Sequence, residues 1–343
     1  MVTRTRSRLR WAWAVPTGLL AALVGVLFWL ADMPPADPDG PPEAATRPTG
    51  QPLHVGLVPE RDVFQQRKRY QALAGYLSAR LTRPVELLTC STYETVLKDF
   101  AERKIDVAFL GSLVSVLAMD RLGAKVLAKP ETPGGISTYR GVIFVREDVP
   151  VRTIEDLAGR TVAMLRTTTA GNLFPSCLFA RNGLTDGPNP PRILWVGTHD
   201  DVLTAVMDGQ ADVGAIKDLR LDALLRSRPD WKVRRLFGSQ AVPNNALLVR
   251  ADLADRLGPR LTSILLKMDA DPEGRRTLAE LGATRFLPCS PADYKPVFDM
   301  IDCVGDRWGE MGVEGPAPRR PPDMPKSPGD RCYVENFSSS SAP

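Results

Sequence analysis

One segment of this chain occurs twice, and the repeat limits the folds that the chain can adopt. Residues 91–97, Ser-Thr-Tyr-Glu-Thr-Val-Leu, align without a gap with residues 197–203, Gly-Thr-His-Asp-Asp-Val-Leu. The match continues into Asp106-Val-Ala, which aligns with Asp212-Val-Gly. Both copies read as a strand, a polar turn, an amphipathic helix and a second strand. Two copies are too few for a solenoid, so the repeat predicts two similar lobes.

Short apolar runs alternate with helical patterns throughout residues 53–313. The strand-like runs include residues 53–59, 84–90, 106–110, 161–165, 192–196 and 212–216, and the helical patterns between them include 69–81, 93–103 and 200–208. Alternation of this kind is typical of βαβ units and mainly parallel sheets. The predicted fold class is therefore α/β.

A second pair of similar segments predicts how the two lobes connect. Phe144-Val-Arg-Glu-Asp148 and Leu248-Val-Arg-Ala-Asp252 are near copies that bracket the second repeat unit. If both are strands that cross between lobes, lobe two (143–248) is inserted into lobe one (53–142 plus 249–313). Two crossing strands form a hinge with a cleft, and parallel sheets bind ligands beyond the carboxyl ends of their strands.

The N-terminus predicts a membrane anchor over residues 1–32. Four arginines before residue 11 account for the whole net charge of +4, and residues 11–31 contain no charged side chain. Twenty-one helical residues span roughly 31 Å, enough to cross a bilayer core. The arginines should stay cytoplasmic, which places the following chain outside. The rival interpretation, a cleaved signal peptide, usually has an apolar core of about 7–15 residues.

The flanking segments and the cysteines complete the expected organisation. Seven prolines in residues 33–52 predict a stiff spacer, and the Pro- and Ser-rich residues 314–343 predict a disordered tail. Five cysteines prevent complete internal pairing, and Cys289 with Cys303 is the expected disulfide because both lie late in lobe one. The absence of any Cys-x-x-Cys spacing argues against a zinc site, and no metal is expected.

Polar side chains follow four of the predicted strands, where helices begin. They comprise Ser91, Thr92 and Tyr93; Gly111 and Ser112; Thr167, Thr168 and Thr169; and Gly197, Thr198 and His199. Helix N-termini favour anions, and hydroxyls add directional donors. Any single Ser or Thr here has an ordinary interpretation as an N-cap, so the prediction rests on the coincidence of the four sites. Together they predict a tetrahedral oxyanion ligand, while His54, near a strand start, is expected to be structural.

These motifs resemble those of the extracytoplasmic phosphate/phosphite/phosphonate-binding proteins of ABC importers, which have a two-lobed, type II periplasmic-binding-protein fold. The resemblance runs from Leu53 to Leu266, and further landmarks are Val55–Glu60, Asp106–Gly111, Thr138–Arg140 and Val242–Asn245. It implies that Thr167, Thr168 and Thr169 hold the anion. It also implies that Tyr93, Tyr139 and His199 close over it.

Two positions depart from the relatives that bind amino-phosphonates, which hold the ammonium group with carboxylates near residues 217–219 and at 245. Here Asp218 lies beside the cation Lys217, and the second position is the neutral Asn245. The resemblance therefore implies a smaller or neutral-tailed oxyanion. No cysteine lies directly after the apolar stretch, where a lipid would be attached, so an anchor helix is expected to tether the chain.

The sequence lacks the motifs of an enzyme, and no cofactor is expected. It has no G-x-S-x-G elbow, P-loop, H-E-x-x-H or dinucleotide-binding fingerprint. With the four N-terminal arginines set aside, basic and acidic residues balance at 40 each, so a nucleic-acid partner is not expected. The predicted protein is single-pass in the cytoplasmic membrane, with a periplasmic domain that captures an oxyanion for an ABC permease. The alternative is a tethered sensor that signals to a membrane partner.

Overall fold

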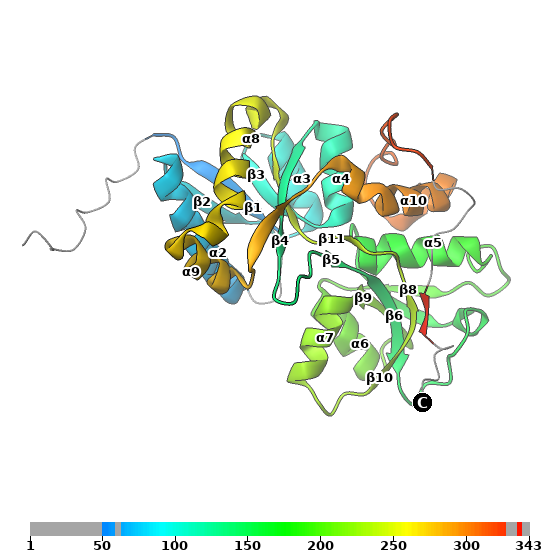
Figure 1. The fold of residues 1–343 in the computed structure, drawn as a ribbon. Coiled ribbons are helices and arrows are strands. Elements are labelled where there is room, and N and C mark those ends of the chain that lie inside the picture. The colour runs from blue at the N-terminus through cyan, green and yellow to red at the C-terminus, as the bar shows by residue number, and fades with distance from the viewer. Residues whose placement is uncertain (1–49, 59–62, 327–334, 338–343) are drawn as a thin grey trace, which may run out of the picture. The chain divides into compact units, whose positions relative to one another are not determined.

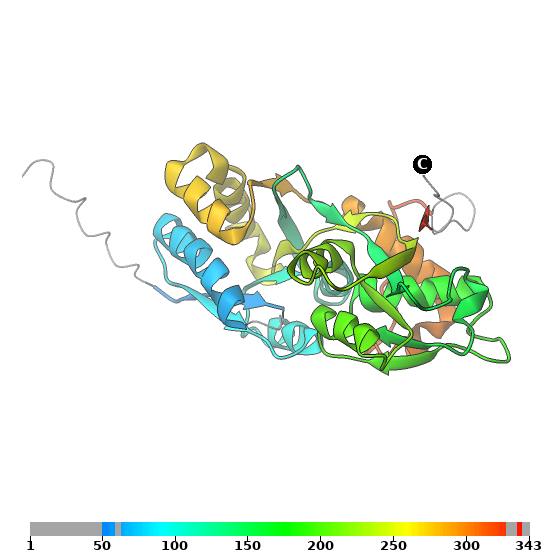
Figure 2. The same cartoon turned by 90° about the horizontal axis from the view of Figure 1, so that it is seen from below.

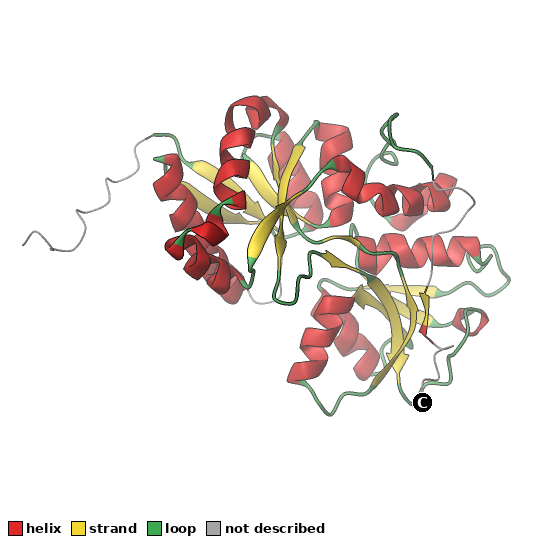
Figure 3. Cartoon of the chain, in the orientation of Figure 1, coloured by secondary structure: helices red, strands yellow, loops and turns green. Residues whose placement is uncertain are grey.

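The computed structural model of the chain describes residues 50–58, 63–326 and 335–337. The predicted anchor and most of the predicted spacer lie outside these ranges. Within them, no helix has both the length and the apolar character that a bilayer span requires. The described chain forms two α/β lobes, each with helices on both faces of its own sheet (Figure 3).

Sheet one has six strands in the order β13-β4-β12-β3-β1-β2 (Figure 1). Its strands are β1 (Leu53–Leu57), β2 (Val85–Thr89), β3 (Val107–Leu110), β4 (Lys125–Glu131), β12 (Ala246–Val249) and β13 (Arg285–Pro288). Strands β2, β1 and β3 are parallel, and the other pairings are antiparallel. Its helices are α2 (Val63–Leu81), α3 (Tyr93–Ala101), α4 (Ser112–Leu122), α8 (Ala251–Leu266) and α9 (Pro272–Leu281). We call this sheet and its helices lobe one.

Sheet two repeats the plan in the order β14-β10-β6-β9-β7-β8. Its strands are β6 (Gly141–Arg146), β7 (Thr161–Met164), β8 (Arg192–Trp195), β9 (Val213–Lys217), β10 (Val233–Gly238) and β14 (Glu335–Asn336). Its helices are α5 (Phe174–Arg181), α6 (His199–Met207) and α7 (Asp218–Ser227). Alternate strand residues bury against opposite helix layers: Phe144 packs with α6 and α7, whereas Ile143 packs with α5. This sheet and its helices form lobe two.

The chain passes between the lobes at a two-stranded ribbon. Strand β5 (Thr138–Tyr139) leads into lobe two, and β11 (Val242–Pro243) leads back and pairs with it in antiparallel register. A hinge of two crossing strands is present, but the predicted location at 144–148 and 248–252 is wrong. Phe144 lies inside sheet two, and Leu248 lies inside sheet one. Each of these two segments continues a strand inside one lobe, so it begins after the chain has passed through the β5–β11 ribbon.

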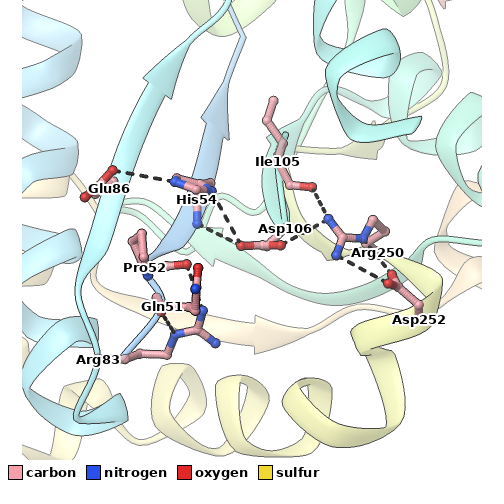
Figure 4. Close-up of polar contacts among 9 residues, drawn as sticks. All are labelled: Gln51, Pro52, His54, Arg83, Glu86, Ile105, Asp106, Arg250 and Asp252. Carbon is pink, nitrogen blue, oxygen red and sulfur yellow. Dashed lines mark hydrogen bonds and ion pairs between the residues drawn. The ribbon is translucent and has the colours of Figure 1, made fainter. Parts of the chain in front are cut away.

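Both pairs of similar segments contain polar residues that lie at the strand ends facing away from the crossing ribbon. These residues have the same structural role in each copy. The Asp106 carboxylate accepts the backbone N–H of His54 at 3.0 Å, and Asp212 accepts that of Thr161 at 2.9 Å. In each case the carboxylate joins two neighbouring parallel strands. Arg250 then binds Asp106 at 3.1 Å and Asp252 at 2.6 Å (Figure 4). The repeats therefore encode a polar clamp that holds strands together.

His54 belongs to this clamp. Its imidazole lies between Glu86, at 3.6 Å, and Asp106, at 3.9 Å (Figure 4). The residue sits in β1 at the end opposite the crossing ribbon. Its contacts are those of a residue that stabilises this end of the sheet.

The C-terminal helix α10 (Lys295–Val304) does not stay with lobe one. It lies beside α5 of lobe two in both views (Figures 1 and 2). Cys303 is disulfide-bonded to Cys177, with a Cα–Cα separation of 5.5 Å. The predicted pair of Cys289 and Cys303 is therefore wrong. The chain turns away from sheet one after β13, which leaves Cys289 buried as a free thiol near the Tyr294 hydroxyl.

The segment that follows α10 is held in place by its own polar groups. The Arg320 guanidinium binds Asp299 at 2.6 Å and Asp302 at 2.9 Å, and its side chain is only 10% exposed. Arg121 of α4 donates to the carbonyl oxygen of Glu314 at 2.6 Å. The prediction of a disordered tail from residue 314 is therefore wrong for residues 314–326, because buried ion pairs compensate for the poor apolar content of the segment.

Candidate functional site

A cavity of about 650 Å³ lies where the carboxyl ends of the strands in both lobes face one another. Parallel sheets of α/β proteins commonly bind ligands at this edge. Eight of the nine side chains predicted for the site line this cavity: Tyr93, Ser112, Tyr139, Thr167, Thr168, Thr169, His199 and Asn245. Residues from lobe one, lobe two and the crossing ribbon therefore converge on one place.

Asp218, the ninth predicted residue, does not line the cavity. It begins α7, and its Oδ1 accepts the backbone N–H of Leu219 at 2.7 Å. Burial raises the pKa of this carboxyl. A carboxylate that does line the cavity is that of Asp200, and Arg220 binds both of its oxygens at 2.7 Å.

The three threonines differ in what their hydroxyls do. Thr167 donates its hydroxyl hydrogen to the Glu94 carboxylate of lobe one, and its φ of 54° is an unusual backbone conformation for a residue with a side chain. Thr168 accepts the backbone N–H of Gly171 at 3.2 Å and is the N-cap of the helix. For Thr168 the ordinary interpretation as a cap is thus confirmed.

Thr169 is the hydroxyl of this turn that remains for a ligand. Its Oγ1 is buried and forms no hydrogen bond of ordinary geometry with any other residue in the described ranges, although it lies close enough to the Tyr139 hydroxyl to influence that group. Residues 169–173 form a π-helical turn that runs directly into α5. The first backbone N–H groups of a helix lack intrahelical acceptors and carry a partial positive charge. The turn therefore presents donors of both kinds to the cavity.

Tyr139 contributes a neutral hydroxyl from the crossing ribbon. Burial raises the pKa of the Tyr139 phenol, and the neighbouring hydroxyls of Ser112 and Thr169 partly offset this effect. Ser112 donates its own proton to the carbonyl oxygen of Pro243 at 2.6 Å, so its oxygen is available as an acceptor. The single hydroxyl proton of Tyr139 can therefore go either to the Ser112 oxygen or to a ligand oxygen in the cavity.

His199 and Tyr93 occupy equivalent positions of the sequence repeat and both line the cavity. Each is the first residue of a helix whose cap is a threonine, Thr198 for α6 and Thr92 for α3. Burial, together with the nearby cations Lys217 and Arg220, lowers the pKa of His199 to about 3. The imidazole is therefore neutral near pH 7. Its Nδ1 is buried and has no hydrogen-bond partner in the part of the chain that the structure describes.

Seven polar lining residues were not among the nine predicted site residues: Gln65, Arg69, Thr198, Asp200, Lys217, Arg220 and Asn244. Lys217 is the last residue of β9, and Asn244 directly follows β11. The rule that side chains at strand ends meet in the cleft therefore also applies to these two residues. The long Arg69 side chain projects from within α2, and no sequence signal marks it. Three of these residues, Arg69, Lys217 and Arg220, are cations, although the chain beyond its first ten residues is neutral overall.

Over the ranges that the structure describes, no three His, Cys, Asp or Glu side chains come together as a possible metal-binding group. The chemistry available in the cavity is hydrogen-bond donation to an anion from hydroxyls, backbone N–H groups, a neutral imidazole and nearby cations.

Comparison with known sequences assigns the chain to a family. The family described as "ABC transporter, phosphonate, periplasmic substrate-binding protein" matches residues 55–294. The chain belongs to this family. It is a substrate-binding protein of the ABC importer class, as its sequence motifs predicted, and the family places the domain outside the cytoplasm.

Two curated relatives are similar over most of their lengths. The phosphonates-binding periplasmic protein of Escherichia coli is 22% identical over 253 residues, covering 71% of this chain and 74% of the relative. The phosphate-import protein PhnD of Mycolicibacterium smegmatis is 22% identical over 303 residues, covering 78% and 90%. By their names, the first relative binds phosphonates in the periplasm and the second takes part in phosphate import.

Solved structures confirm the architecture. PhnD1 from Prochlorococcus marinus, determined in complex with methylphosphonate, has a TM-score of 0.62 and 19% sequence identity. The similarity covers 73% of this chain and 96% of that one. The two-lobed periplasmic-binding-protein fold of the phosphonate-binding family is therefore present in the described residues.

Proposed function

We propose that this protein captures a phosphonate or phosphate in the cleft between its lobes and delivers it to an ABC permease. The observation that carries the proposal is a pair of buried polar atoms in the cavity lining, Thr169 Oγ1 and His199 Nδ1, without a hydrogen-bond partner among the described residues. A buried polar group left unpaired costs about 1–3 kcal/mol. A phosphoryl oxygen between them would satisfy both.

The arrangement of donors suggests an order of events. Thr169, the start of its helix and His199 all belong to lobe two, so an anion can bind this lobe first. Tyr93 and Ser112 of lobe one and Tyr139 of the ribbon would then complete the site as the lobes close. The ligand shifts the population toward the closed form only by its higher affinity for that form.

The binding test is a thermal-shift and calorimetry panel on the purified full chain with phosphate, phosphite, methylphosphonate, 2-aminoethylphosphonate and sulfate. A ligand at about 100 times its Kd adds roughly 2.7 kcal/mol to the free energy of unfolding. Thr169→Val and His199→Asn should each abolish or strongly reduce this stabilisation. Thr284→Val, at an exposed position of lobe one outside the cavity lining, is the matched control and should leave it unchanged. Absence of stabilisation by every oxyanion at millimolar concentration would refute the proposal.

The membrane anchor is a second part of the proposal, and it rests on residues 11–31 as a sequence. A tethered domain stays beside its permease, which raises its local concentration there. The test is alkaline carbonate extraction of cell membranes: the full chain should stay in the pellet, and a chain without residues 1–32 that carries a separate signal peptide should be released. A mature N-terminus located after residue 31 would show instead that the stretch is removed.

A further inference from the structure

A side-chain hydrogen bond joins the two lobes directly at the edge of the anion site. Thr167 of lobe two donates its hydroxyl hydrogen to the carboxylate of Glu94, which lies in the first turn of α3 in lobe one. Thr167 is 1% exposed and lines the cavity, whereas Glu94 lies outside the lining. Glu94 therefore contacts the wall of the site from behind, and any movement that takes α3 away from this wall breaks the hydrogen bond.

The backbone of Thr167 adopts a conformation that its side chain disfavours. Its φ of 54° lies in the left-handed region, where a β-branched residue is a genuine outlier. Such conformations are costly, and they persist only where neighbouring contacts hold them. Thr167 directly precedes Thr168, which caps the helix, and Thr169, whose buried hydroxyl lines the cavity. The direction in which the chain leaves residue 167 therefore sets the position of the Thr169 hydroxyl.

Glu94 differs in its contacts from its counterpart in the sequence repeat. The equivalent residue of lobe two is Asp200, and Arg220 of α7 in the same lobe binds both of its oxygens. Helices α4 and α7 begin at equivalent positions of the repeat, and the residue of α4 that corresponds to Arg220 is the buried Val114. Lobe one thus has a valine where lobe two has the arginine, and the Glu94 carboxylate bonds to Thr167 of the other lobe instead.

We propose that Glu94 is a positioning residue of the binding site, which holds Thr167 in its left-handed conformation and thereby directs the Thr169 hydroxyl toward the ligand. Because Glu94 belongs to lobe one, the anion-binding turn of lobe two reaches its final geometry only when lobe one is in place. The proposal rests on the proposed function and deepens it. It gives closure of the lobes a direct effect on the donors of lobe two, so that the closed form binds the anion more tightly.

The test is calorimetry of the full chain at neutral pH with methylphosphonate and phosphate as the probes. Glu94→Ala should raise the Kd about tenfold, whereas Glu94→Gln, which keeps an acceptor oxygen, should stay within about threefold of wild type. Thr167→Val removes the hydroxyl but keeps the branched side chain, so it should weaken binding as Glu94→Ala does. The double variant Glu94→Ala/Thr167→Val should bind no more weakly than either single variant, because both changes remove the same hydrogen bond.

Glu102→Ala, which removes an exposed carboxylate at the other end of α3 and outside the cavity lining, is the matched control and should leave the Kd unchanged. Wild-type affinity in Glu94→Ala would overturn the proposal. So would an equal loss in Glu94→Gln and Glu94→Ala, because the acceptor oxygen would then not be what matters. Additive losses in the double variant would also overturn it, since the two residues would act independently. Failure of the wild-type chain to bind either probe would instead refute the proposed function, so the two failures are distinguishable.

Discussion

Acidification should destabilise this protein through His199. The pKa of His199 in the folded protein is about 3, whereas an unfolded histidine titrates near 6.5. Between these values the unfolded chain binds a proton that the native state rejects, so the free energy of unfolding falls as the pH decreases. The loss begins near pH 6.5, steepens to about 1.4 kcal/mol per pH unit and ends near pH 3. Between pH 7 and pH 5 it amounts to about 2 kcal/mol.

The assay is urea denaturation of the ligand-free protein at pH 7, 6 and 5, with wild type and His199→Asn in parallel. Asparagine keeps a polar side chain in the cavity but does not titrate, so the variant should lose about 2 kcal/mol less than wild type over this range. His54→Asn, in the clamp at the opposite strand ends, is the control variant and should retain the wild-type loss associated with His199. Identical pH profiles for wild type and His199→Asn would show that burial and the adjacent cations do not set the charge of this imidazole.

Three other substitutions test the packing and the polar clamps. Replacing Cys177 and Cys303 by serine opens a cross-link that spans 126 residues, so urea denaturation should show a loss of about 2–5 kcal/mol, and a loss below 1 would count against a structural role for the bond. Gly141→Ala places a methyl group 2.9 Å from the Phe174 ring, next to the turn that carries the anion donors. Calorimetry should therefore show weaker phosphonate binding, and unchanged affinity would mean that the turn adjusts without moving its donors. Asp106→Ala removes the carboxylate that accepts the backbone N–H of His54 and binds Arg250. Thermal unfolding should show a loss of about 1–3 kcal/mol in stability, and ligand affinity should not change. A changed affinity would contradict the separation of the clamp from the cleft.

Much of the site could be predicted because it follows a rule about strand ends. Side chains that follow buried strands meet at the carboxyl edge of a parallel sheet, and this rule predicts that Ser112, Tyr93 and His199 share one cavity, as they do. The repeat predicted the two lobes for the same reason, since each copy is one strand–helix–strand unit. What these predictions share is dependence on local sequence alone.

The incorrect predictions depend on long-range geometry. The pairing of Cys303 required knowledge that α10 leaves lobe one and packs against α5, and no local pattern encodes this course. Thr168 caps the helix, whereas the Thr169 hydroxyl remains for a ligand. This difference depends on the backbone angles of the turn, which two residues of the same type cannot reveal in the sequence. Arg69 lines the cavity because a long side chain reaches across from a helix, and a periodicity argument assigns such a residue to solvent.

The disulfide between α5 and α10 also restricts the direction in which the lobes can separate. Leu117 of α4, Leu178 of α5 and Phe298 of α10 belong to one buried apolar cluster, so parting the lobes along this edge would expose it to water. We therefore expect the rotation axis to run close to α10. Opening about such an axis would widen the cavity on the side away from α10. We expect ligand to enter and leave on that side.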